Sequence, residues 1–230
     1  IGWFDEQRAS LAGAVGRLIE LGEVRVLVRV GAVILEFAGT PQRFFQDDWV
    51  FAAPVGGARV APANGQRHDS GDYRVGTVVR LTPAEASWLT VLRFGARLPT
   101  TDNLVGLDRD QTDFYALVGT EHIKRRWRFA AELGLGIFGT RLSNFEQSDV
   151  LLYSGTLQYA DNRLMPFVTV VGQDDFNDRH IRGNEDLSEM RAGLRLGKAR
   201  WMEAAFVYGL REYSPGAGFW LGGGLTLDWR

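Results

Sequence analysis

The sequence predicts an all-β chain folded as one antiparallel up-and-down sheet that closes into a barrel. Three observations favour this fold. Apolar residues recur at every second position, which is the period of a β-strand. Short and long polar links alternate strictly from Gln46 onward, as in a meander with short turns at one end and long loops at the other. No linker, charge block or low-complexity segment divides residues 1–230, so a single domain is expected.

Nine strands are predicted between Asp72 and Trp229. The clearest runs from Trp127 to Ile137, where apolar residues at odd positions alternate with Arg128 and Glu132. The nine predicted strands cover residues 72–81, 88–98, 112–123, 127–137, 149–159, 164–174, 187–196, 200–211 and 217–229. For 112–123, 149–159 and 164–174 the alternation leaves open which face is apolar.

The N-terminal part is less regular. Strands at about 32–45 and 17–30, with a further strand within residues 3–16, bring the predicted total to 12; the alternative total is 10. An even number places both termini at the short-turn end. Strands of about 9–11 residues are long enough to cross a membrane.

The links between strands fall into two classes. The predicted short turns are Leu81–Ala86, His122–Arg126, Ala160–Arg163 and Gly197–Ala199. The predicted long loops are Gln46–Gly71, Pro99–Gln111, Gly139–Ser148, Gln173–Asp186 and Glu212–Gly216. The acidic residues in these loops lack the spacing of an EF-hand, so they are expected to be solvated loop tips.

The two faces of the predicted sheet differ in chemistry, and this decides which face is the outside. A soluble sandwich or lipocalin-like barrel would turn the apolar face inward. No helical segment is amphipathic enough to cover that face, and aromatic residues gather near strand ends, where membrane and water meet. These aromatics are Trp88, Trp127, Trp201, Phe219 and Trp229. The sequence therefore favours a transmembrane barrel of the bacterial outer membrane, with short periplasmic turns and longer extracellular loops.

Charged residues recur in mid-strand on the opposite face, which would line the lumen. The predicted lumen-lining residues are Arg25, Arg29, Arg74, Arg80, Arg93, Arg97, Arg128, Glu132, Glu189, Arg191, Arg195 and Glu203. Two interpretations stay open. The residues could form an arginine-lined path that selects polar or anionic solutes, or their ion pairs could plug a narrow barrel and cross-link its wall.

Composition excludes several other functions. The net charge of −2 gives no electrostatic basis for binding nucleic acid, and the absence of cysteine excludes disulfides and thiolate metal sites. His68, His122 and His180 lack metal-ligand spacing, and Ser154 with His180 lacks a G-x-S-x-G motif, so neither a metal, a cofactor nor an enzyme is expected. No apolar run reaches the length of a transmembrane helix, and no signal peptide is visible, which would fit a mature or trimmed protein.

Several stretches resemble bacterial outer-membrane β-barrel transporters. They are GDYRVGTVVRL at 71–81, LRFGARLPTTDN at 92–103, TDFYALVGTE at 112–121, DVLLYSGTLQY at 149–159, and GNEDLSEMRAGLRLG at 183–197 followed by RWMEAAFVYGL. The chain is similar to the family described as outer-membrane components of the phenol meta-degradation pathway. The resemblance implies a porin-like channel or transporter for small solutes, hydrophobic or aromatic compounds among them. The expected partners are outer-membrane lipid, lipopolysaccharide, a small-molecule solute and a partner protein at the loops or the periplasmic side.

Overall fold

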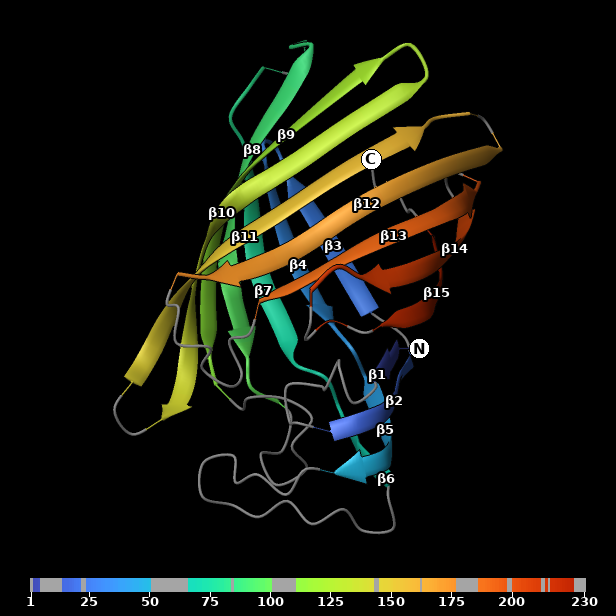
Figure 1. The fold of residues 1–230 in the computed structure, drawn as a ribbon. Helices are drawn as coiled ribbons and strands as arrows, with labels where there is room; N and C mark the ends of the chain where they lie inside the picture. The colour runs from blue at the N-terminus through green and yellow to red at the C-terminus, as the bar shows by residue number, and fades with distance from the viewer. Residues whose placement is uncertain are drawn as a thin grey trace.

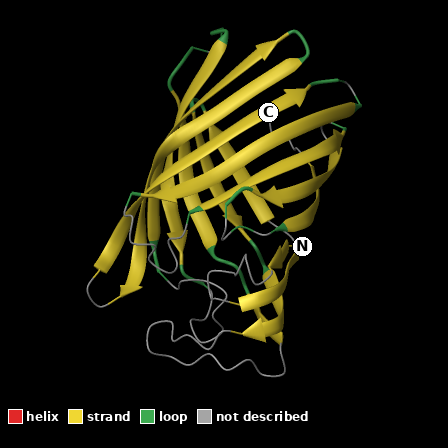
Figure 2. Ribbon diagram, in the orientation of Figure 1, coloured by secondary structure: helices red, strands yellow, loops and turns green. Residues whose placement is uncertain are grey.

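The computed structural model describes residues 2–4, 14–21, 24–50, 66–83, 85–100, 111–142, 145–161, 163–176, 186–197, 200–211, 214 and 216–225. The described residues form one antiparallel sheet of 15 strands (Figure 2). The strands are β1 (Gly2–Phe4), β2 (Ala14–Leu21), β3 (Val24–Val30), β4 (Val33–Gly39), β5 (Gln42–Val50), β6 (Gln66–Asp69), β7 (Tyr73–Arg80), β8 (Trp88–Leu98), β9 (Asp113–Lys124), β10 (Trp127–Leu142), β11 (Phe145–Tyr159), β12 (Leu164–Asp175), β13 (Leu187–Leu196), β14 (Arg200–Gly209) and β15 (Ala217–Leu225).

Eleven of these strands form an up-and-down meander in the order β3, β4 and then β7 to β15. From β7 onward each strand pairs with the next strand in the chain. β4 pairs with β7, although β5 and β6 lie between them in sequence. The sheet is strongly tilted and curved, so that β3, β4 and β7 lie behind β11 to β13 in Figure 1. This confirms the predicted all-β, antiparallel up-and-down architecture.

The N-terminal strands differ from the prediction. The stretch predicted as one strand at 32–45 is divided into β4 and β5 at Pro41, whose ring nitrogen cannot donate to a ladder. The stretch predicted at 17–30 is divided into β2 and β3. Leu21 pairs with Gln42 and Val24 with Gly39, so the β2–β5 and β3–β4 ladders share one register.

The predicted strand within residues 3–16 is not a single strand. Phe4 of β1 pairs with Gly16 of β2 in antiparallel register, so the two ends of this stretch belong to different strands. On its other side β1 pairs with β15, with Trp3 opposite Ala217. The described residues therefore contain more N-terminal strands than the three that we expected.

Short connections lie at one end of the meander. The β3–β4 and β13–β14 connections contain glycines with positive φ, 61° at Gly31 and 80° at Gly197, a conformation that glycine adopts without steric cost. The β9–β10 turn places Arg125 at φ 58°. At the other end the prediction of a long loop at Gly139–Ser148 is wrong. β10 and β11 continue through a register shift as far as the pair Leu142 and Phe145, because a β-bulge allows the ladder to run on through polar sequence.

Candidate functional site

On strands such as β10 and β14 the alternate side chains differ in exposure, and the more exposed set is apolar. On β10 the exposed fractions are 57% for Leu133 and 55% for Leu135, whereas Phe138 on the opposite face is 7% exposed. On β14 Met202 is 70% exposed and Val207 is 8% exposed. Large hydrophobic side chains thus lie on the outward face of the curved sheet. We call this the apolar face.

All twelve residues predicted to line a lumen lie on the opposite face, which we call the charged face. Strand alternation and the cross-strand registers from β3 to β14 place them together. Arg25, Arg29 and Arg74 are exposed, and the other nine are partly buried. This face also holds buried apolar side chains, namely Ala38, Val78, Phe138, Val150, Met165, Phe167, Ala205 and Val207. The sequence did not indicate that group, because Met165 and Phe167 lie in a strand whose alternation was ambiguous.

The centre of the charged face is an ion cluster formed by Glu36, Arg93 and Glu132. Arg93 Nη1 lies 2.6 Å from Glu36 Oε2, and Arg93 Nη2 lies 3.1 Å from Glu132 Oε1. Arg93 on β8 thereby reaches over β7 to β4 on one side and over β9 to β10 on the other. Arg25 adds a longer contact of 3.6 Å to Glu36. The Glu36 side chain is 9% exposed, so its charge needs these partners.

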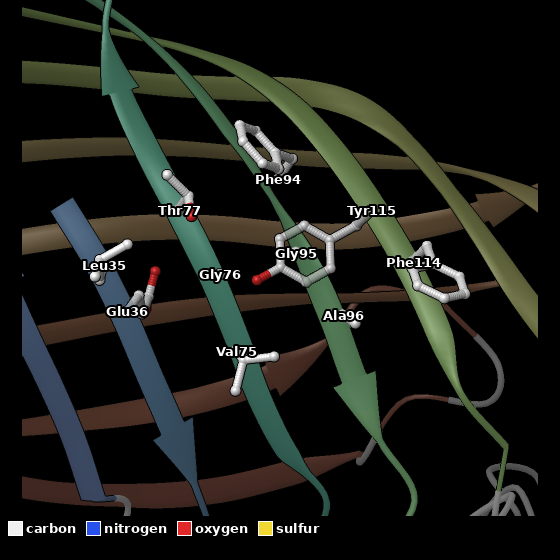
Figure 3. Close-up of a pocket in the computed structure, with 10 residues that line it drawn as sticks. All are labelled: Leu35, Glu36, Val75, Gly76, Thr77, Phe94, Gly95, Ala96, Phe114 and Tyr115. Atoms are coloured by element: carbon white, nitrogen blue, oxygen red, sulfur yellow. The ribbon is translucent and has the colours of Figure 1, made fainter. Parts of the chain in front are cut away.

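Glycines clear the path for Glu132 of this cluster and for the neighbouring Tyr115. A Cβ at Gly119 of β9 would lie 3.1 Å from Glu132 Cγ, within the space that the glutamate crosses. On β7 and β8 a Cβ at Gly76 or Gly95 would lie 2.8 or 2.6 Å from the hydroxyl of Tyr115. Figure 3 shows the Tyr115 ring lying across β8 at Gly95, with its hydroxyl directed toward Gly76. The glycines therefore let long side chains cross neighbouring strands.

A pocket of about 580 Å³ lies against this part of the sheet (Figure 3). Its lining residues are Leu35, Glu36, Val75, Gly76, Thr77, Phe94, Gly95, Ala96, Phe114 and Tyr115. The lining alternates between residues of the two faces, since at Gly76 and Gly95 no side chain thickens the sheet.

Further ion pairs extend along the charged face toward both ends. Toward the long loops, Arg97 pairs with Asp113, and Asp113 Oδ1 accepts a hydrogen bond of 3.0 Å from the Gly139 amide. Toward the short turns, Arg128 Nη2 donates to Glu121 Oε2 at 2.7 Å. On β13, Arg191 Nε donates to Glu189 Oε1 at 2.6 Å.

Sequence reasoning missed the carboxylates that complete these pairs. Glu36, Asp113 and Glu121 were absent from the predicted lumen set although they neutralise Arg93, Arg97 and Arg128. A signal existed for Glu36, which alternates with Leu35 and Phe37. The other two acids lie in residues 112–123, where the face was ambiguous.

The predicted interface aromatics divide between the two faces. Trp88, Trp127 and Phe219 are exposed on the apolar face, at 51%, 44% and 56%. Trp201 lies on the charged face, where the Arg195 guanidinium is 4.2 Å from its ring centroid. Its odd position places it with Glu203 rather than with Met202. Trp229 lies outside the described residues.

The histidines and acids form no metal-binding constellation in the described part of the chain, where no group of three or more suitable side chains converges. His122 stacks on Trp88 with ring centroids 4.4 Å apart, and its Nδ1 lies 2.7 Å from the Ser87 carbonyl oxygen. His68 is exposed on β6, and His180 lies outside the described residues. Within the described ranges, no helix has the length and hydropathy needed to cross a membrane.

Compared with protein-family models, curated proteins and solved structures, the chain matches none. The resemblance to outer-membrane transporters therefore stays a prediction. The geometry itself establishes an all-β protein with a large antiparallel meander sheet, one apolar face and one ion-paired face.

Proposed function

We propose that the protein is an integral outer-membrane β-barrel that acts as a channel or transporter for small solutes. The observation that carries the proposal is the inverted exposure of its two faces, with large apolar side chains outward and most of the charged side chains of the opposite face partly buried. In water this arrangement would leave many large hydrophobic side chains exposed. Each Å² of apolar surface exposed to water costs about 25 cal/mol of free energy. In a bilayer the same surface contacts acyl chains, while the sheet satisfies its own backbone hydrogen bonds.

Closure of the barrel is part of this proposal. β1 pairs with β15 on one side and with β2 on the other. The β2–β5 ladder and the β3–β4 ladder have the same register, so β2 is in line with β3, and β5 with β4. If β2–β3, β4–β5 and β6–β7 are each counted as one bent strand, the total becomes twelve, the number expected from the sequence. A barrel of this size leaves a narrow interior that arginine and glutamate side chains line.

The charged face favours the proposal that small solutes pass between fixed charges. Ion-paired walls would tune selectivity by charge, since rings of charged side chains do so in other pores. The aromatic and hydrophobic compounds implied by the family resemblance belong to the proposed range of solutes. The outer membrane, its lipid and lipopolysaccharide, and a partner protein at the loops or the periplasmic side complete the proposed setting.

A second candidate function is a sealed barrel that serves as a membrane anchor or partner-binding subunit. One observation favours it: Arg93 bridges Glu36 and Glu132 over two intervening strands, and such bridges fill a narrow interior. In that case the ion pairs stabilise the wall and no continuous path exists.

Two measurements test these candidates in turn. Purified protein is expected to require detergent and to change its gel migration on boiling, as folded membrane barrels do. Solubility in plain buffer with identical migration would overturn the membrane proposal.

In planar bilayers the wild type should then give discrete conductance steps, and Arg93→Ala should give larger steps because it opens the central bridge. The matched control is Arg211→Ala, which removes an exposed pair with Asp174. Steps that appear only in Arg93→Ala would establish the sealed barrel.

A further inference from the structure

Three neighbouring short turns form one continuous edge of the sheet. The Ala160 amide of the β11–β12 turn donates a 2.5 Å hydrogen bond to the Arg126 carbonyl oxygen of the β9–β10 turn. The Gly197 amide of the β13–β14 connection donates a 3.2 Å hydrogen bond to the Arg163 carbonyl oxygen. In Figure 1 the β9–β10 and β11–β12 turns follow one another along the upper right edge of the sheet.

This edge is strongly basic. Five exposed cations belong to the turns or to the strand residues beside them, and we call them the basic rim: Lys124, Arg125, Arg126, Arg163 and Arg200. Among the described residues of the three turns, Asp161 is the acidic side chain, and it is partly buried. The rim therefore carries a clear excess of positive charge in a chain whose net charge is −2.

Aromatic rings lie directly beside the rim, on the apolar face. Trp127 contacts Tyr159 edge to face with centroids 5.1 Å apart, and Arg126 Nη1 donates to the Tyr159 hydroxyl at 3.2 Å. Beyond the rings the apolar face continues with exposed Phe129 and Leu157. Moving along the wall, the order is cation, amphipathic ring, hydrocarbon.

We propose that the basic rim binds the phosphate groups of anionic phospholipids at the membrane surface on the short-turn side. A phospholipid presents phosphate, ester region and acyl chain in the order in which this wall presents cations, aromatic rings and aliphatic side chains. The cations form an open line along three turns rather than an enclosing pocket, which fits a surface bearing many phosphates better than one free anion. This inference rests on the proposed function, because it requires a bilayer around the apolar face.

The test uses tryptophan quenching by brominated lipids in reconstituted vesicles. The full chain is inserted into phosphatidylcholine vesicles that contain brominated phosphatidylglycerol or, in parallel, brominated phosphatidylcholine at the same mole fraction. The ratio of quenching gives the relative association of the anionic lipid. The test variant is Lys124→Gln/Arg126→Gln/Arg163→Gln, and the matched control is Arg211→Gln, an exposed arginine on the long-loop side.

The wild type and the control should prefer phosphatidylglycerol several-fold at low salt, and the triple variant should lose most of this preference. Each cation contributes at most about fivefold, because a surface cation gains about 1 kcal/mol from an anionic membrane. The preference should vanish at about 1 M salt, where charges are screened beyond about 3 Å. Inorganic phosphate at matched ionic strength should leave it unchanged.

Three results would overturn the proposal: equal quenching by both lipids in the wild type, an undiminished preference in the triple variant, or loss of the preference on adding inorganic phosphate. The last would assign the rim to free phosphate. In all three cases quenching itself still demonstrates insertion. Absence of quenching by either lipid would instead overturn the proposed membrane function.

Discussion

The apolar face and the charged face are made by the same strands but are stabilised in different ways. On the apolar face, neighbouring side chains pack side by side along the sheet, as Phe206 and Phe219 do with centroids 5.7 Å apart. On the charged face, Arg93 bonds to carboxylates two strands away in both directions. The inner side of a curved sheet brings side chains together, and its outer side spreads them apart. Curvature therefore decides which face can neutralise its own charges.

The largest expected effect comes from placing a charge on the apolar face. Leu133→Arg should lower the free energy of unfolding in vesicles by about 3 kcal/mol, because arginine near the bilayer midplane of a barrel costs about 2–4 kcal/mol. Urea titration of the reconstituted protein measures this.

The matched control for Leu133→Arg is Leu210→Arg. Leu210 is 48% exposed just after the end of β14, near the loop side. There the cost should fall below about 1 kcal/mol, since the penalty depends on depth. Equal effects at both positions would contradict a lipid-facing apolar face.

Removing the central cation should have the next largest effect. Arg93→Ala leaves Glu36 and Glu132 without their shared partner and should lower the free energy of unfolding by about 2 kcal/mol. This is less than the 3–5 kcal/mol for a fully buried pair, because the Arg93 side chain is 29% exposed. Denaturant titration measures the loss. Arg211→Ala, which breaks the exposed pair with Asp174, should cost under about 1 kcal/mol. If the two variants lose equal stability, the cluster has no special role.

The sequence predicted the faces more accurately than the contacts across them. Alternation is a local property, so Arg93 and Glu132 could be assigned to one face from their own strands. Which carboxylate meets Arg93 depends on the curvature of the sheet and on glycines in the intervening strands, and neither is visible in one strand. Asp113 was missed because the face of residues 112–123 was ambiguous, and Glu36 was missed although its alternation with Leu35 and Phe37 indicated its face.

The N-terminal strands were predicted poorly for a different reason. Their boundaries depend on a bend at Pro41 and on the pairing of β1 with both β2 and β15. Trp201 is a separate case. Its closeness to a turn suggested the membrane boundary, whereas its position two residues from Glu203 on β14 places it on the charged face.

A smaller loss of stability than for Arg93→Ala is expected when alanine replaces a glycine that lies against a neighbouring strand, and none when it replaces a glycine beside open space. A Cβ at Gly134 would overlap the backbone of Ala116 and Leu117 on β9, whereas a Cβ at Gly155 would have nothing within 4 Å. Gly134→Ala should therefore destabilise the protein by about 1–2 kcal/mol, because the neighbouring backbone must shift. Gly155→Ala is the control and should be neutral or slightly stabilising, since alanine loses less conformational entropy on folding. Thermal unfolding of both variants measures the difference, and equal melting temperatures would count against the close approach at Gly134.

The smallest effect on stability, and the most direct comparison of the two faces, comes from two tryptophans. Trp127 is 44% exposed on the apolar face, whereas Trp201 lies under Arg195 on the charged face. Replacing either with phenylalanine should change the free energy of unfolding by less than about 1 kcal/mol, because an aromatic ring remains. Quenching by phosphatidylcholine brominated on its acyl chains should nevertheless separate them. Trp127→Phe should remove part of the quenchable fluorescence, and Trp201→Phe should remove only fluorescence that the lipid does not quench. If Trp201 proves to be the quenched residue, the assignment of the charged face to the interior is wrong.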